Sequence, residues 1–158
     1  MPDLITHVAM SHLIKRPFEF KQESRVAIPM RTLFYLGTIL PDVLSRPLYI
    51  LIPVTQEWVV IYHTPFGLIL VSSLLTLFFD STIRKKAWIN LTAGGLFHFL
   101  LDSFQKQILS GISWLWPFSW RAFGYGLMEA GDILYYIPLW LGLVIIMEAG
   151  FFLWRKKV

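Results

Sequence analysis

The sequence lacks cysteine altogether and carries few charged residues. With no cysteine in 158 residues, neither a disulfide framework nor a thiolate metal site is possible, and the redox compartment stays open. Charged residues make up 15% of the chain and hydrophobic residues 56%. In soluble domains about 25% of the residues are charged and roughly 45–50% are apolar. The composition therefore indicates a membrane protein, and the length fits a single domain over residues 1–158.

The placement of the basic residues bears on the kind of partner. A net charge of +4 is compatible with nucleic acid binding. However, the arginine and lysine triplets at 84–86 and 155–157 each follow an apolar run. Cytoplasmic anchors of membrane helices have this placement. We therefore expect membrane lipid as a partner and no nucleic acid.

Long apolar runs predict membrane-spanning helices, which need about 20 predominantly apolar residues. Residues 59–80 and 133–154 supply that length, while 31–54 and 88–109 are candidates interrupted by ionisable residues. Residues 2–14 predict a helix too short to span. The expected fold is all-α, a polytopic membrane helical bundle of about four transmembrane helices plus a short N-terminal helix. The alternative is a soluble all-α domain with buried apolar helices.

The positive-inside rule orients these spans. We place both basic triplets and the basic stretch from Lys15 to Arg31 in the cytoplasm, so both termini are expected there. The loop 110–132 then lies on the outer side. Glu148, near the basic end of its span, is expected to snorkel or to pair with the basic tail.

Ionisable residues inside the predicted spans are the candidate functional residues. Such groups are costly in hydrocarbon, so they usually face a protein interior or an aqueous cavity. In the predicted topology Asp42, His63, His98 and Asp102 lie at a similar depth toward the outer side, on three helices. We therefore predict that they form one shared site.

His98 and Asp102 are four residues apart, which makes them neighbours on one helix face. They can bind one metal ion, or they can form a structural hydrogen-bonded pair. The further ionisable residues at the same depth favour the metal ion. Gly94 and Gly95, one turn before His98, allow another backbone to approach closely.

Two more histidines lie near the start of the chain. His7 and His12 project about 140° apart on a helix, so they do not both face one site. We favour His7 as a ligand and His12 as an interfacial residue. Imidazole and carboxylate ligands without thiolate suit zinc, and also manganese or iron.

Five motifs follow one another along residues 2–120: PDLITHVAM at 2–10, LGTILPDVL at 36–44, HTPFGLIL at 63–70, GGLFHFLLDSF at 94–104 and WLWPFSW at 114–120. Together they resemble the inner-membrane metal-dependent hydrolase family, also described as LexA-binding, inner membrane-associated hydrolases. That family is distantly similar to zinc-dependent phospholipase C. The resemblance implies a multi-pass protein of the cell inner (cytoplasmic) membrane. It also implies a set of polar motif residues that would act as metal ligands: His7, Asp42, His63, His98 and Asp102.

The chain departs from the family pattern in two places. Val43 and Leu44 follow Asp42, where family members often carry a second acidic residue. His63 is the one histidine in a stretch where family members often have two. Both departures favour one metal ion, or an enzyme that has lost its activity, over a full multi-metal site.

The predicted function is that of a membrane-bound metal-dependent hydrolase acting on a phosphoester or lipid-like substrate, with zinc as the favoured metal ion. Asp42 either binds the metal ion or acts as general base. The alternatives are a metal or proton transporter and a regulatory membrane protein with a structural metal site. The sequence makes no prediction for the oligomeric state.

Overall fold

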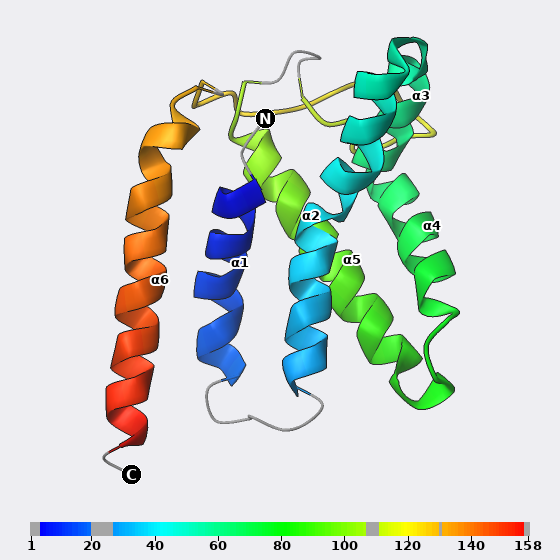
Figure 1. The fold of residues 1–158 in the computed structure, drawn as a ribbon. Helices are drawn as coiled ribbons and strands as arrows, with labels where there is room; N and C mark the ends of the chain where they lie inside the picture. Colours follow the sequence, from blue (N-terminus) through cyan, green and yellow to red (C-terminus); the bar gives the residue numbers. More distant parts are fainter. Residues whose placement is uncertain (1–3, 20–26, 107–110, 130, 157–158) are drawn as a thin grey trace.

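The structure, a computed structural model, describes residues 4–19, 27–106, 111–129 and 131–156 (Figure 1). Within these ranges the regular elements are helices, and two isolated β-bridges follow the fifth α-helix. In chain order the α-helices and 3₁₀-helices (η) are α1 (Leu4–Glu19), α2 (Ala27–Leu51), η1 (Pro53–Thr55), α3 (Gln56–Val59), η2 (Val60–His63), α4 (Pro65–Thr76), α5 (Ser81–Ser103) and α6 (Ile133–Arg155). The predicted all-α class is confirmed for the described residues.

Two glycines let α2 and α5 cross in direct backbone contact. A Cβ atom on Gly37 would lie 2.1 Å from the carbonyl oxygen of Leu91, and one on Gly94 would lie 2.0 Å from that of Phe34. No side chain fits at either position, so the close approach predicted at Gly94 is confirmed. On the side of the crossing toward the start of both helices, a buried apolar cluster fills the seam: Met30, Leu33, Ala87 and Leu91.

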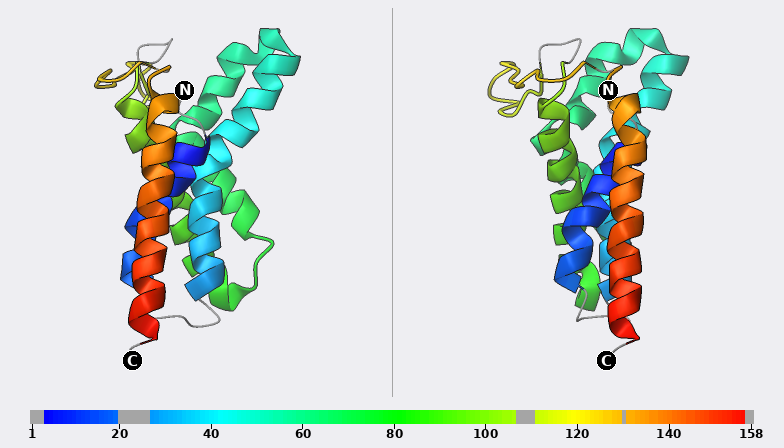
Figure 2. Two further views of the ribbon diagram at one scale, coloured as in Figure 1. Left: turned by 60° about the vertical axis from the view of Figure 1, so that its left-hand side comes forward. Right: turned by 90° about the vertical axis from the view of Figure 1, so that its left-hand side faces the viewer.

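The helix α2 continues through two prolines and changes direction along its length (Figure 2). Pro41 and Pro47 each remove a backbone donor, and each ring crowds the carbonyl of the preceding turn, which bends a helix. Pro41 directly precedes Asp42. The bent upper part of α2 leads into η1, α3 and η2, which return the chain toward α4 (Figure 1).

The prediction of one continuous span over residues 59–80 is wrong. The helical path breaks at Thr64, whose backbone is extended (φ −121°, ψ 151°), between η2 and α4. A residue before proline disfavours the α conformation, and Pro65 follows here. The Thr64 hydroxyl then accepts a hydrogen bond from the Gly67 N–H at 3.1 Å and caps α4. With 12 residues, α4 is about 18 Å long, which is shorter than a hydrocarbon core of about 30 Å.

The helix α6 fits a membrane crossing. Within Leu134–Arg155, its most apolar 18-residue window reaches a mean hydropathy of 1.9, and none of the residues of α6 whose burial is described is buried. By length and composition it is the one such helix in the described part of the chain. In α2 and α5, ionisable residues interrupt the apolar runs. The span over 133–154 thus has a matching helix, whereas a polytopic bundle of about four spans is not confirmed.

The basic ends of the helices gather at one end of the bundle. Arg84 lies in the first turn of α5 and Arg155 ends α6, and both helix ends lie at the bottom of Figure 1. This agrees with the expected common side of the basic triplets. However, α1 begins toward the opposite end from the end of α6 (Figure 1). The expectation that both termini face the cytoplasm is therefore not confirmed.

Residues 111–129, which follow α5, lie over the upper end of the bundle (Figure 1). An isolated bridge pairs Ile112 with Phe123. Ile112 is buried and packs against Leu68 of α4 and Phe99 of α5. Because Phe99 directly follows His98, this loop closes the core beside that histidine.

The helix crossing predicts a strong effect of one methyl group. Gly94→Ala should lower the free energy of unfolding by at least about 1–3 kcal/mol, the usual cost of overpacking, because the clash is with backbone. Gly142→Ala in α6 is the matched control, since nothing lies within 4 Å of a Cβ atom there. Denaturant or thermal unfolding in detergent measures both variants. Equal stability of the two variants would contradict the described crossing.

Candidate metal centre

The structure brings all five predicted ligands together from four helical elements. His7 comes from α1, Asp42 from α2, His63 from the end of η2, and His98 and Asp102 from α5. The side chains of His7, His98 and Asp102 are 0% exposed, and those of Asp42 and His63 are 1% and 15% exposed. Ionisable groups buried this deeply need charge partners or a metal ion.

One group of donors joins α1 to α5. His7 Nε2 lies 3.5 Å from Asp102 Oδ1, and His98 Nε2 lies 3.4 Å from Asp102 Oδ2. The two imidazole centroids are 4.5 Å apart. The carboxylate thus presents one oxygen to each histidine, and the three residues could hold a metal ion.

A second group joins α2, η2 and α5. Asp42 Oδ1 lies 3.2 Å from His63 Nε2 and 3.9 Å from His98 Nε2. The His63 and His98 ring centroids are 5.5 Å apart. These three residues also form a group that could hold a metal ion.

His98 belongs to both groups and lies between them. Its ring is fully buried, and neither ring nitrogen makes a well-formed hydrogen bond with a described residue, since Nε2 lies 3.4 Å from Asp102 Oδ2 and 3.9 Å from Asp42 Oδ1. Buried polar atoms in folded proteins are nearly always hydrogen-bonded, so this arrangement requires an explanation. A metal ion at Nε2 would supply a partner for that nitrogen. Because one nitrogen lone pair binds one ion, the two groups cannot each hold an ion through His98 Nε2.

A buried hydroxyl pair holds α1 in place against α2. Ser11 Oγ donates a hydrogen bond to Thr38 Oγ1 at 2.9 Å, and Thr38 Oγ1 donates to the Phe34 carbonyl at 2.9 Å. Ser11 lies one turn after His7, and Thr38 lies one turn before Asp42. The contact therefore sets the register of the two ligand-bearing turns.

A tight approach of η2 to α4 positions His63. A Cβ atom on Gly67 would lie 2.1 Å from the carbonyl oxygen of Ile61, so η2 folds directly against the first turn of α4. The break at Thr64 separates the two elements and leaves His63 as the last residue of η2. The break at Thr64 and Pro65, which interrupts the predicted span 59–80, therefore also places His63 beside Asp42.

Arg46 is a site residue that the sequence analysis missed. Its Nη2 lies 2.6 Å from Asp42 Oδ2, and its side chain is 27% exposed. The signal in the sequence was the spacing of four between Asp42 and Arg46 on one helix. Arginine is not a metal-ligand type, so the pattern of ligand residues in the predicted span 31–54 did not include Arg46.

His12 lies outside the centre, in a separate polar cluster that joins α1 to α6. Its Nδ1 is 2.8 Å from the Tyr35 hydroxyl, and its Nε2 is 2.9 Å from Glu148 Oε1. Arg16 Nε also donates to Glu148 Oε1 at 2.7 Å. Glu148 therefore contacts α1, in contrast to the expected pairing with the basic tail.

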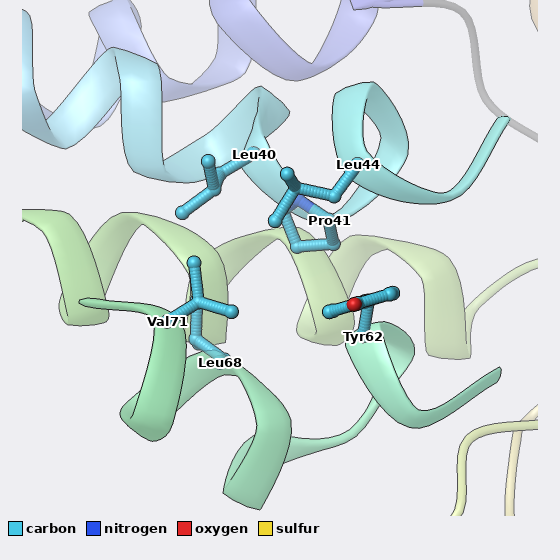
Figure 3. A pocket seen from close by; sticks show the side chains of 6 residues that line it. All are labelled: Leu40, Pro41, Leu44, Tyr62, Leu68 and Val71. Atoms are coloured by element: carbon cyan, nitrogen blue, oxygen red, sulfur yellow. The ribbon is translucent and has the colours of Figure 1, made fainter. Parts of the chain in front are cut away.

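A crevice beside the centre is closed. In Figure 3, Tyr62 lies opposite Pro41, while Leu68 and Val71 lie opposite Leu40. These apolar side chains leave essentially no room for a water molecule between α2, η2 and α4. The more exposed side chains around the centre are those of His63 and Arg46, at 15% and 27%.

Comparison with known proteins places the chain in a family. The sequence model described as YdjM inner membrane protein matches residues 1–157, so the chain belongs to the YdjM inner membrane protein family. Comparisons with curated proteins and with solved structures found no match. Membership supports a location in the inner membrane, and the hydrolase and LexA-binding aspects of the resemblance are not confirmed.

The position of His98 predicts its effect on metal binding. We expect the purified protein to contain a divalent metal ion and His98→Ala to lose it, because His98 contributes to both donor groups. His12→Ala is the matched control, since this histidine lies outside the centre. Elemental analysis of the three proteins measures metal per chain. An unchanged metal content in His98→Ala, or a wild type without metal, would contradict the centre.

Proposed function

We propose that this inner membrane protein is a metal-dependent hydrolase that cleaves a phosphoester in a lipid-like substrate. The observation that carries the proposal is the state of His98. Its fully buried imidazole presents Nε2 to the carboxylates of both Asp42 and Asp102, at 3.9 and 3.4 Å, without a well-formed hydrogen bond to a described residue. Histidine and carboxylate donors of this kind hold the ions of metal-dependent hydrolases.

The donor types support zinc as the metal ion, because imidazole and carboxylate ligands without thiolate suit it. His98 and His7 approach the two different oxygens of Asp102 at 3.4 and 3.5 Å. These separations exceed the roughly 2.7–3.2 Å of an ordinary N–H···O hydrogen bond. Manganese and iron are alternatives that the same donor types accept.

The side chains of the centre would have different roles. A bound divalent ion would lower the pKa of a coordinated water toward about 7 and polarise a phosphoryl oxygen. His7, His98 and Asp102 lie on the closed side and would hold the ion, whereas His63 faces the more exposed side.

Asp42 is better placed as a ligand than as a general base. Its Oδ2 faces the guanidinium of Arg46 at 2.6 Å, and its Oδ1 faces the imidazoles of His63 and His98. A carboxylate beside a permanent positive charge strongly favours its ionised form and accepts a proton weakly. The role of Asp42 as general base therefore has little support from its surroundings.

A groove beside α6 supports a lipid-like substrate. It has a volume of about 470 Å³ and lies between α1, α2 and α6, where Val8, Ile39 and Leu141 are among its apolar lining residues. Pockets for small ligands typically measure about 300–1,000 Å³. Because α6 fits a membrane crossing, this groove suits an acyl chain of a membrane amphiphile. The groove and the centre share α1 and α2.

The seam of α2 and α5 argues against a transporter. An ion pathway needs polar sites that continue through the bundle. Toward the start of both helices, the centre is followed by the backbone contacts of Gly37 and Gly94 and by an apolar cluster of Met30, Leu33, Ala87 and Leu91. The arrangement therefore favours a centre that is open on one side over a pathway.

The proposed activity predicts chelator-sensitive cleavage. The purified protein in detergent should cleave members of a panel of phosphodiesters and phospholipids, and excess chelator should abolish the activity. Loss of a residue that only supports a metal ligand typically lowers activity roughly 10–100-fold. Because His63 is itself a ligand candidate, His63→Ala should lower kcat/KM by more than this. His12→Ala is the control and should retain the activity.

Three outcomes distinguish the proposed function from its alternatives. Release of phosphate-containing product identifies the hydrolase. Metal uptake into liposomes without product would identify a transporter, and stoichiometric metal with neither activity would identify a structural site. Either of the last two results would overturn the proposal.

A further inference from the structure

Residues 111–129 expose large apolar side chains. The side chain of Phe118 is 93% exposed, and further apolar side chains are more than half exposed: Leu115, Trp120, Phe123, Tyr125 and Leu127. Single exposed apolar residues are common on soluble proteins, whereas larger apolar surfaces mark sites of contact with protein or membrane. We call these side chains, from Leu115 to Leu127, the aromatic patch.

The backbone beneath the aromatic patch is held by hydrogen bonds. Ile112 and Phe123 exchange two backbone hydrogen bonds, each of 3.0 Å. The Leu127 N–H donates to the carbonyl of Phe104, just after α5, at 2.8 Å. Ile112 is buried, and Trp114 packs against the same apolar cluster. The segment therefore has a packed inner side, and the aromatic patch is the outer side of a fixed backbone.

Large and small residues alternate where this segment returns along the end of α5. Phe123, Tyr125 and Leu127 are exposed, and alanine or glycine occupies positions 122, 124 and 126 between them. A Cβ atom on Gly124 would lie 3.4 Å from the carbonyl oxygen of Ser103, so Gly124 faces the end of α5. Successive residues of an extended chain face opposite sides, and a side in water is usually polar. Here the outer side is apolar, which suits surroundings less polar than water.

The position of the segment relative to α6 indicates what these surroundings are. Residues 111–129 lie at the end of the bundle where α6 begins (Figure 1). The chain from Glu129 to Ile133, the first residue of α6, spans at most about 15 Å. Because α6 fits a membrane crossing, its start lies at one membrane surface. The aromatic patch therefore lies near the level of that surface, where Leu134 and Tyr135 are also exposed.

A second apolar segment is exposed at the same end of the bundle. The side chains of Leu51, Val54 and Trp58, from the end of α2 to α3, are each more than two thirds exposed. In Figure 1 this part of the chain also lies at the upper end. Two segments that are far apart in the sequence thus expose apolar side chains at one end, and a lipid surface is extended enough to contact both.

We propose that the aromatic patch inserts into the lipid of the membrane surface at which α6 begins. Tryptophan and tyrosine are enriched at membrane–water interfaces, because each combines an apolar ring with a group that hydrogen-bonds to water or headgroups. The patch supplies Trp120 and Tyr125 beside purely apolar side chains such as Phe118. The segment would thus be a second membrane contact besides α6, and this inference does not depend on the metal centre.

Site-directed spin labelling of the full-length protein in phospholipid vesicles tests the inference. The sequence contains no cysteine, so one introduced cysteine carries the only label. Phe118→Cys and Leu127→Cys label the patch at two exposed positions, so the test remains possible if one variant does not fold. Ile145→Cys, exposed near the middle of α6, is the lipid control, and Lys85→Cys, exposed near the start of α5, is the water control.

The depth of each label follows from its collisions with oxygen, which concentrates in lipid, and with a water-soluble nickel complex. Both patch labels should collide preferentially with oxygen. Their expected depth is about 5–10 Å into the boundary between headgroups and acyl chains, as for other interfacial apolar groups. The label at Ile145 should lie deeper, and the label at Lys85 should collide preferentially with nickel.

Three results would overturn the inference. Nickel collisions at both patch positions as frequent as at Lys85 would place the patch in water. Protection of both patch labels from both reagents would show that protein covers the patch, and spectral broadening by neighbouring labels would identify that protein as a second copy of the chain. Free access of nickel to the label at Ile145 would show that α6 does not fix the level of the patch.

Discussion

The direct contact between the backbones of α2 and α5 is the constraint on which the rest of the structure depends. At Gly37 and Gly94 each helix rests on a carbonyl of the other, so the helices cross without a side chain between them. On the next turns, Asp42 follows Gly37 and His98 follows Gly94. A wider crossing would separate these side chains, because Asp42 Oδ1 and His98 Nε2 are 3.9 Å apart at the present spacing. The glycines thus set the separation of Asp42 and His98, which lie about one helical turn further along α2 and α5.

The helix α1 connects the centre to the helix that fits a membrane crossing. One part of α1 carries His7, which faces Asp102 in α5. A later turn carries His12 and Arg16, which contact Glu148 of α6. Since none of the described residues of α6 is buried, this polar cluster is a specific attachment between an apolar helix and the bundle. A change in how α6 lies against α1 would therefore act on the position of His7.

The sequence predicted the candidate site more completely than the membrane topology. The cost of ionisable residues in apolar runs, together with the family motifs, was enough to select five side chains that the structure brings together. Apolar length alone did not show that Thr64 and Pro65 divide residues 59–80, because a local cap and a proline override a favourable hydropathy. The partners of Glu148, His12 and Arg16, lie 136 and 132 residues away in the chain, so no local pattern indicated them.

The central claim is that histidines and aspartates from separate helices bind one metal ion. X-ray absorption spectroscopy at the zinc edge, on the purified protein loaded with zinc, tests it most directly. The account predicts a shell of about four nitrogen or oxygen ligands at about 2.0–2.1 Å. It also predicts outer-shell scattering from more than one imidazole. A protein that binds no zinc, or a ligand shell without imidazole, would contradict the account.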